Sequence, residues 1–304
     1  MLGGLIVGGS GFVGRSLLDR LGPNRGVGTS AKHQSSGLLQ FDATKQRLTD
    51  LLPTLPLQVS HVFVLYGIVN PELCARDPED TAKTNVHSII RLLEDAFAAS
   101  LVPVFVSTDY VFDGSRGMRR EDERQSPTTE YGRQKSAVER WLQKREEPWL
   151  ITRLSKVVGG DRMSHSVLGQ WVNDIYAGRA MRSATDQIFS PADVQDIAQA
   201  LVDLADARCQ GIVHVAGEAM SRFDLNTILV DAVRRANPSV TAAVQHCTLR
   251  EIPFTELRPL DTSLATERLD DILTWRFKSM QALANEVAAQ HFGDPARPIG
   301  REGP

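Results

Sequence analysis

A tyrosine and a lysine four positions apart, Tyr131 and Lys135, are the most suggestive pair of reactive side chains in this sequence. In a helix, residues with this spacing lie on the same face, so the phenol and the ammonium would be neighbours. A phenol with an ordinary pKa of about 10 is a poor acid at neutral pH, and a nearby ammonium lowers that pKa. The pair could therefore transfer a proton to or from a substrate oxygen while a nicotinamide carries the hydride.

A hydroxyl that could complete this pair follows an apolar run at 102–106. That run leads into Ser107-Thr108-Asp109, and ligands of open α/β sheets bind beyond the carboxyl ends of the strands. Thr108 is therefore expected to hydrogen-bond the reacting oxygen of a substrate. We predict a catalytic set of Thr108, Tyr131 and Lys135.

A glycine-rich segment near the start of the chain has the features of a phosphate-binding loop. Gly8, Gly11 and Gly14 are spaced three apart, between a short apolar strand at 5–7 and a helical pattern over 12–21. Glycine lets the backbone approach a pyrophosphate closely, and a helix N-terminus adds N–H groups and partial positive charge. An ordinary strand-to-helix turn is the alternative. We predict dinucleotide binding by Gly8, Ser10, Gly11, Phe12, Val13 and Gly14.

The end of the second predicted strand, 26–29, indicates which dinucleotide is bound. Enzymes that use NAD usually carry an acidic residue there, which bonds the ribose 2′-hydroxyl. This chain has Ser30 and Lys32 instead, and no carboxylate nearby. Both residues are expected to bind a 2′-phosphate, which favours NADP and leaves NAD as the alternative; Lys32 could also be an ordinary surface lysine. Asp42 could accept a hydrogen bond from the adenine amino group, or could equally cap the following helix.

The elements that must position these residues alternate between short apolar strands and helices. Continuous β-branched and aromatic runs such as 59–65 are typical of parallel strands that are buried on both faces. Strands are expected at 5–7, 26–29, 38–41, 59–65, 102–106 and 149–151, and helices at 12–21, near 86–97 and at 131–144. The alternation predicts an α/β fold with a doubly wound parallel Rossmann sheet over 1–153.

After Arg153 the pattern is less regular and predicts a smaller C-terminal substrate domain over 154–292. Helices are expected near 166–177, 191–207, 222–236 and 277–291, and strands near 187–189 and 211–215, with Rossmann elements returning near 190–216. A flexible tail is expected over 293–304. The charged run 119–124 is expected to be a solvated loop or a lid over the substrate. One core-facing helical stripe is expected from Trp275, Phe277, Met280, Leu283 and Val287.

Composition excludes several classes of protein. Of the 304 residues, 42% are hydrophobic and 23% are charged, which is typical of a globular chain. The net charge of −3 gives no basic excess for binding nucleic acid. The longest apolar run, 62–69, is too short to span a membrane, and no secretory signal is evident. Cys74, Cys209 and Cys247 lack disulfide or metal spacing, so we expect buried thiols in a reducing cytoplasm and no metal site.

In these motifs and their order, the chain resembles the extended short-chain dehydrogenase/reductase superfamily, and within it the dTDP-4-dehydrorhamnose reductase branch. The resemblance covers most of the chain. It rests on the glycine pattern at 8–14, on STDYVFDG at 107–114 and on Pro127 followed by Tyr131 and Lys135. Two later segments support it, namely Ser190-Pro191-Ala192-Asp193-Val194 and Arg258-Pro259 with Asp261, Ser263 and Leu264.

The resemblance implies an NADP-dependent reductase that acts on a keto group of a nucleotide-activated sugar, with a homodimer as one assembly. It implies the same catalytic set, Thr108, Tyr131 and Lys135. Asn85 would steady the active-site lysine through water, and for Arg258 a surface salt bridge is an equal alternative to substrate binding. Further cofactor contacts are implied at Tyr66, Gly67, Asn85 and Lys135. Substrate contacts are implied at Thr108, Asp109, Val111, Lys156 and Arg258.

Two segments depart from the reductase pattern and leave the sugar open. Lys156 stands where those reductases usually carry an aromatic residue that shapes the sugar pocket, and a lysine there could suit a more anionic substrate. The segment 66–71 is also unusual for that branch. Two other functions remain as alternatives. A 4,6-dehydratase or epimerase is one, although dehydratases usually have Asp-Glu where this chain has Asp109-Tyr110. The other is a non-catalytic NADP-binding subunit that resembles the regulatory subunit of methionine adenosyltransferase.

Overall fold

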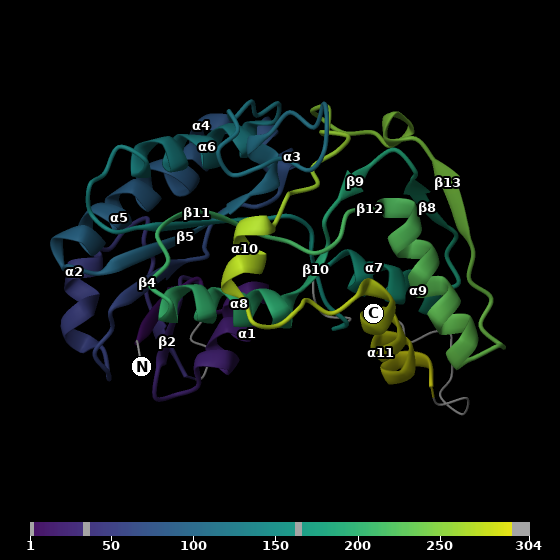
Figure 1. Ribbon diagram of the computed structural model, residues 1–304, viewed down its shortest axis with the longest axis horizontal. Helices are drawn as coiled ribbons and strands as arrows, with labels where there is room; N and C mark the ends of the chain where they lie inside the picture. The colour runs from purple at the N-terminus through teal and green to yellow at the C-terminus, as the bar shows by residue number, and fades with distance from the viewer. Residues whose placement is uncertain (1–2, 33–36, 162–165, 294–304) are drawn as a thin grey trace.

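A parallel sheet of seven strands forms the larger part of the protein, in the order β3-β2-β1-β4-β5-β6-β11 (Figure 1). The computed structural model describes residues 3–32, 37–161 and 166–293. Every neighbouring pair in this sheet is parallel, and the inner strands are buried on both faces. The strands are β1 (Gly4–Val7), β2 (Gly26–Ser30), β3 (Leu38–Gln40), β4 (His61–Val64), β5 (Val102–Thr108), β6 (Leu150–Leu154) and β11 (Gly211–Val215).

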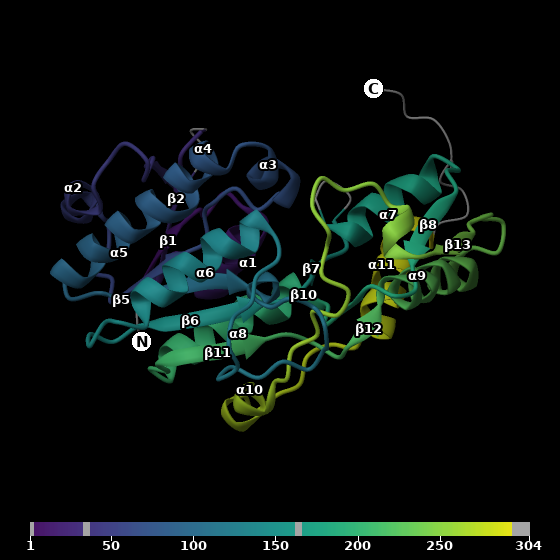
Figure 2. The ribbon, with the colours of Figure 1, turned by 90° about the horizontal axis from the view of Figure 1, so that it is seen from above.

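Helices cover both faces of this sheet (Figure 2). On one face, α1 (Phe12–Leu21), α8 (Val194–Asp206) and α10 (Glu267–Ile272) contribute apolar side chains to a core with β1, β4, β5, β6 and β11. On the other face, α2 (Leu48–Leu51), α5 (Ile89–Ala98) and α6 (Glu130–Leu142) form a second core. Two short helices, α3 (Pro71–Arg76) and α4 (Pro78–Ala82), precede a π-helical turn, Lys83–Ser88, that leads into α5. The predicted doubly wound Rossmann sheet is confirmed.

The C-terminal half has a core of its own. Helices α7 (Val167–Tyr176), α9 (Arg222–Ala236) and α11 (Met280–Phe292) pack with the strand pair β8 (Met181–Ala184) and β13 (Val244–Cys247). Two further pairs join β7 (Val157–Val158) to β10 (Ala192–Asp193) and β9 (Ile188–Phe189) to β12 (Met220–Ser221). This smaller unit lies to the right of the sheet in Figure 1. Its predicted limits, 154–292, and its role in substrate binding stay predictions.

The predicted helical stripe from Trp275 to Val287 is wrong. Trp275 and Phe277 precede α11 and stack on each other, with ring centroids 5.2 Å apart, against the core that faces the sheet. Met280 and Val287 belong to the core of the smaller unit. The apolar residues therefore serve two cores, because Ser279 begins a new helix as its N-cap. The predicted tail lies outside the described residues from 294 onward.

The structure was also searched for membrane-spanning helices and for disulfide bonds. Among the described residues, no helix has the length and apolar character needed to cross a membrane. All three cysteines are free thiols; Cys74 and Cys247 are buried, and Cys209 is partly exposed.

Candidate active site

The glycine loop at the start of α1 has the close packing that a phosphate-binding loop requires. Gly8 adopts a φ of +99°, a conformation that favours glycine. A Cβ atom on Gly14 would lie 2.3 Å from the carbonyl oxygen of Gly8, so the first turn of α1 could not approach the loop with a larger residue. Among the described residues no side chain caps α1, and its first turn has no acidic residue. The loop therefore fits an anionic group such as a pyrophosphate.

The six predicted loop residues differ in their surroundings. Gly14 is buried and acts as a spacer, whereas Ser10 and Val13 are partly exposed and Gly11 is exposed. The ring of Phe12 reaches the segment after β7, where a Cβ atom on Gly159 would lie 2.7 Å from its Cζ. Phe12 thus links the phosphate loop to the second half of the chain.

The end of β2 carries the residues expected to select the dinucleotide. Ser30 is buried, while Lys32 is exposed and free to approach a ligand. The Asp42 carboxylate accepts hydrogen bonds from the Thr44 amide (3.0 Å) and hydroxyl (2.6 Å) and pairs with Lys45. Asp42 therefore stabilises its own turn, and the helix that it was predicted to cap begins only at Leu48, after the N-cap residue Arg47.

A buried asparagine, Asn85, fixes the position of the loop that follows β4. Asn85 accepts a hydrogen bond from the Ile68 amide (2.7 Å) and donates to the Ile68 carbonyl (2.9 Å) and to Gln134 of α6 (2.7 Å). A Cβ atom on Gly67 would lie 3.0 Å from the Asn85 side chain. Asn85 sits in the π-helical turn, a feature that is frequent at functional sites. Its direct contacts are with the loop and with the neighbour of Lys135.

The side chain of Tyr66 contacts other residues of the protein, although Tyr66 was predicted to contact the cofactor. Its hydroxyl is 2.9 Å from that of Ser88, and its ring packs with the core on the α5 side of the sheet. A cofactor contact at Tyr66 would therefore involve the backbone, which also lies against Gly8.

The predicted catalytic residues come from β5 and α6. Thr108 is the last residue of β5, and its hydroxyl donates to the Asp109 carboxylate (2.9 Å) and accepts from the Tyr110 amide (3.3 Å). The Thr129 hydroxyl caps α6. A Cβ atom on Gly132 would lie 2.1 Å from the Tyr110 carbonyl oxygen, so this glycine lets α6 pack directly on the 3₁₀ turn Asp109–Val111. That contact brings Tyr131 next to Thr108.

The Tyr131 and Lys135 side chains have different partners. The Tyr131 ring meets the Tyr110 ring edge to face, with centroids 6.1 Å apart. Lys135 is buried; its ammonium donates to the Val106 carbonyl (2.9 Å) and lies 4.7 Å from the centre of the Phe105 ring. The lysine thus fastens α6 to β5, in addition to any contact that it makes with a ligand.

The pKa of Tyr131 is raised, whereas the sequence predicted that Lys135 would lower it. Burial raises the pKa of Tyr131, the nearby Asp109 carboxylate raises it further, and the Thr108 hydroxyl opposes both effects. Burial lowers the pKa of Lys135 to about 8, against the opposing charge of Glu139. The tyrosine is therefore a neutral phenol at physiological pH, a form that can donate a proton.

The predicted substrate residues surround Asp109 and Tyr110. Asp109 is buried, which raises the pKa of its carboxyl group, and it accepts a hydrogen bond from Ser155 (2.9 Å), the residue before Lys156. Arg258 forms an ion pair with Glu72 of α3 and also interacts with Tyr110. Val111 is buried in an apolar cluster of four, with Phe112, Ala216 and Leu264, and gives this turn a rigid base.

Sequence reasoning missed two residues that act on the candidate site, Arg222 and Glu139. Burial lowers the pKa of Lys156, and the charge of Arg222, at the start of α9, lowers it further. The Arg222 guanidinium carbon lies 5.3 Å from the centre of the Trp171 ring. Glu139 of α6 forms a buried ion pair with Arg153 of β6. The Ser-x-x-Asp pattern at 221–224 does indicate a helix start, but no pattern indicates which distant residues these two side chains meet.

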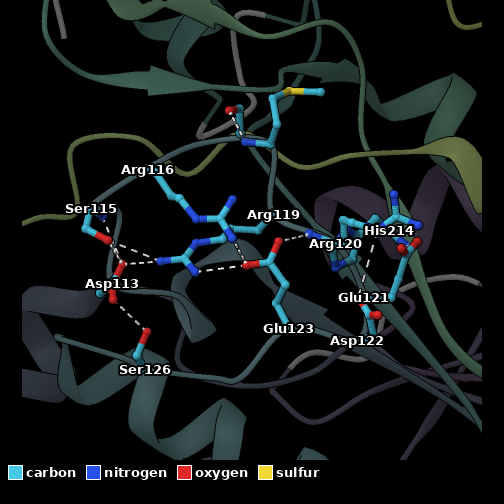
Figure 3. Close-up of polar contacts among 12 residues, drawn as sticks. Asp113, Ser115, Arg116, Arg119, Arg120, Glu121, Asp122, Glu123, Ser126 and His214 are labelled. Carbon is cyan, nitrogen blue, oxygen red and sulfur yellow. Dashed lines mark hydrogen bonds and ion pairs between the residues drawn. The ribbon is translucent and has the colours of Figure 1, made fainter.

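The charged run 119–124 is a loop that is solvated in part. Arg120, Asp122 and Arg124 are exposed, as expected, whereas Glu121 and Glu123 are partly buried. Arg119 is buried and lies between Asp113 (2.6 Å) and Glu123 (3.0 Å), as Figure 3 shows. Its backbone amide donates to the Ser263 carbonyl (3.1 Å), and its carbonyl accepts from Ala265 (2.9 Å). These contacts attach the segment to the residues around 263–265. The run of charges predicts the solvated part of the loop, whereas the partners of Arg119 are set by the tertiary fold.

Comparison with known proteins identifies the family. Residues 4–291 match the family model of the RmlD substrate binding domain. The methionine adenosyltransferase 2 subunit beta of Xenopus tropicalis is 26% identical over 244 residues, which cover 75% of this chain and 71% of that protein. The probable low-salt glycan biosynthesis reductase Agl14 of Haloferax volcanii is 35% identical over 120 residues, 38% of this chain and 40% of that one.

Solved structures show the same fold. The dTDP-4-dehydrorhamnose reductase of Bacillus anthracis, solved in complex with NADP, has a TM-score of 0.79 and 18% identity, and the match covers 96% of this chain and 99% of that one. The family match extends over nearly the whole chain, which confirms the resemblance that the motifs indicated. The protein therefore belongs to the RmlD substrate binding domain family.

Proposed function

We propose that the protein is an NADP-dependent reductase that converts a keto group of a nucleotide-activated sugar into an alcohol. The observation that carries the proposal is the contact between the first turn of α6 and the turn after β5, which sets Tyr131 beside Thr108. The glycine loop lies at the carboxyl end of the same sheet, two strands away along the order β5-β4-β1. The nucleotide sugar would bind between this edge and the unit over 154–292.

The cofactor assignment rests on the loop at 8–14 and on the end of β2. The glycine cradle and the uncapped start of α1 would hold the pyrophosphate, and Lys32 would contact a 2′-phosphate. When bound, the reduced nicotinamide supplies a hydride. The NADP complex of the Bacillus anthracis reductase supports the same choice of cofactor. NAD is the alternative.

Residues of the protein would then orient and protonate the substrate oxygen. The Tyr131 phenol would give its proton to the carbonyl oxygen as the carbon takes the hydride that a bound cofactor would supply, so that the products would be an alcohol and the oxidised cofactor. The phenol regains its proton from solvent. Thr108 would orient the carbonyl by turning its hydroxyl from Asp109 to the substrate oxygen. Lys135 would hold the nicotinamide ribose from its place on α6.

A non-catalytic NADP-binding subunit is the second candidate. It is favoured by the identity with the methionine adenosyltransferase 2 subunit beta, which extends over 75% of this chain. Epimerase or dehydratase chemistry is less well supported, because Tyr110 follows Asp109 where a dehydratase would need a second carboxylate.

A screen of keto-sugar nucleotides for NADPH oxidation tests the proposal. The expected result is consumption of NADPH with at least one substrate and loss of that activity in Tyr131→Phe. If no keto sugar is reduced and the protein instead co-purifies with a partner enzyme, whose binding survives Tyr131→Phe, the reductase assignment is wrong.

A further inference from the structure

Three cationic side chains from distant parts of the chain meet beside Asp109 and Tyr110. Lys156 follows β6, Arg222 begins α9, and Arg258 lies in the segment before α10. The charges of Arg222 and Arg258 both act on Lys156, and both also act on the Tyr110 hydroxyl. Hydrogen bonds hold their three segments together. The Arg222 amide donates to the Gln187 carbonyl (2.9 Å), and the Ile188 amide donates to the carbonyl of Leu260 (2.7 Å), two residues after Arg258. The Ser190 amide donates to the hydroxyl of Ser155 (3.0 Å), the residue before Lys156.

The cations are poorly neutralised by the protein. Within the part of the chain that the structure describes, neither Lys156 nor Arg222 forms an ion pair, and Arg258 pairs only with Glu72. Asp109 is the carboxylate that faces Lys156, and its burial favours the neutral form. Charged groups withdrawn from water are normally paired or bound to a ligand, because leaving them unpaired is costly. An anionic ligand would supply the counter-charge that these side chains lack.

Two nitrogen atoms of this cluster are buried and have no hydrogen-bond partner. They are Nε of Arg222 and Nη1 of Arg258. The Arg258 side chain is only 6% exposed, and Glu72 satisfies its other terminal nitrogen. The Trp171 ring orients the Arg222 guanidinium and the Phe254 ring that of Arg258, at 5.3 and 4.9 Å from the ring centres. The donors are thus preorganised and unsatisfied, as in a binding site for an oxyanion.

The cluster adjoins the proposed reaction centre. Lys156 follows Ser155, which donates to Asp109 (2.9 Å), and Asp109 accepts from the Thr108 hydroxyl (2.9 Å). Tyr110 is in edge-to-face contact with Tyr131. A ligand that placed its carbonyl oxygen at Thr108 and Tyr131 would therefore present a nearby substituent to Lys156.

We propose that Lys156, Arg222 and Arg258 bind an acidic substituent of the sugar itself, so that the substrate is a nucleotide-activated sugar acid. This inference rests on the proposed function and names its substrate class. The diphosphate of the nucleotide is the other anion that could meet these cations, so the test must separate the two sources.

The test compares pairs of nucleotide sugars that share the diphosphate and differ only in the acid. UDP-glucuronate and UDP-glucose form one pair, and the corresponding thymidine diphosphates form another. Calorimetric titration is carried out on the full chain saturated with NADP⁺. A charge-assisted contact predicts that the sugar acid binds about 10- to 100-fold more tightly than the neutral sugar in at least one pair.

Three variants locate the preference. Lys156→Gln should bring the affinity ratio close to one, and Lys156→Arg should keep the preference because it keeps the charge. Lys144→Gln is the matched control, since Lys144 is exposed beyond the far end of α6. Circular dichroism verifies that each variant is folded. If Lys156→Gln is unstable, Lys156→Arg still tests the inference, because loss of the acid preference in this variant would contradict it.

Three outcomes overturn the inference: equal affinity of the wild type for acid and neutral sugars, the same loss for both sugars in Lys156→Gln, or no binding of any of the four compounds. The second outcome would assign the cations to the diphosphate. Failure of the reductase proposal is distinct, because it would appear as an acid preference without NADPH oxidation by any keto sugar.

Discussion

The carboxylate of Glu139 and the guanidinium of Arg153 form an ion pair that is closed to solvent, with 2.7 Å between Nη2 and Oε2 and side-chain exposures of 0% and 1%. Glu139 lies one helical turn after Lys135 on α6, while Arg153 lies on β6. The same carboxylate accepts a hydrogen bond from Ser107, the neighbour of Thr108 on β5. Glu139 therefore fastens α6, which carries Tyr131 and Lys135, to β6 through Arg153 and to β5, which carries Thr108, through Ser107.

Removing one charge of this pair should destabilise the protein strongly. Glu139→Gln leaves the Arg153 guanidinium without its counter-charge, and losses of about 3–5 kcal/mol in the free energy of unfolding are typical of such changes. Urea denaturation measures the loss. Asp174→Asn provides the comparison, because it breaks the largely exposed pair with Arg179 and should cost about 1 kcal/mol or less. Similar losses in both variants would contradict this view of Glu139.

Replacing the proposed proton donor should affect turnover but not cofactor binding. Tyr131→Phe removes the phenol proton, and general acid catalysis is typically worth about 10²–10⁴-fold in rate. Affinity for NADP should be retained, since the glycine loop lies on another strand. Steady-state kinetics and fluorescence titration measure the two quantities. Tyr176→Phe makes the same chemical change in the smaller unit and should leave turnover intact; near-full activity of Tyr131→Phe would refute the assignment.

The choice between NADP and NAD should depend on Lys32. If this exposed lysine contacts a 2′-phosphate, Lys32→Ala should weaken NADP binding by roughly 10- to 100-fold and leave NAD binding nearly unchanged. Calorimetry with both cofactors gives the ratio of the affinities. Lys83→Ala, which removes an exposed lysine paired with Asp80, serves as the control. An unaltered ratio in Lys32→Ala, or a wild type that prefers NAD, would show that Lys32 does not select the cofactor.

The pH profile of turnover should report on Lys135. Burial lowers the pKa of this ammonium to about 8, so the positive charge is lost as the pH rises through about 8 rather than near 10. If the cation positions the cofactor, kcat/KM should fall above pH 8. Lys135→Met should be slower throughout and lack that alkaline decrease. A wild-type profile that is flat from pH 7 to 10 would mean that the charge of Lys135 is not needed.

His214 should make the protein sensitive to acid. Burial, followed by the charge of Arg153, lowers its pKa to about 3, so the folded state keeps His214 neutral while the unfolded chain binds a proton below its usual pKa of about 6.5. Stability is therefore lost as the pH falls below 6.5, by about 1.4 kcal/mol per unit and roughly 2 kcal/mol by pH 5.

Urea denaturation at pH 7 and pH 5 measures this effect. His214→Asn should reduce the difference in unfolding free energy between the two pH values, even if it lowers stability at both. The control is His87→Asn, which changes an exposed histidine and should leave the pH difference as in the wild type. A full pH difference in His214→Asn would assign the acid sensitivity to other groups.

Much of the fold was predictable because its signals are local. The continuous run at 59–65 predicts a strand that is buried on both faces, and the structure has β4 (His61–Val64) there. The spacing of Gly8, Gly11 and Gly14 predicts close packing of the backbone, and the overlap that a Cβ atom on Gly14 would create is the physical reason. The four-residue spacing of Tyr131 and Lys135 required only that the segment be helical.

The sequence alone thus determined the class of sheet, the close-packed glycine loop and the helix that carries the tyrosine and the lysine. Only the tertiary structure decided how these groups ionise and what they meet, because desolvation and ion pairing depend on segments distant in the chain. Burial raises the pKa of Tyr131, although the helical spacing alone predicted a lower value. Likewise, no local pattern brings Lys156, Arg222 and Arg258 together; hydrogen bonds between their distant segments do so.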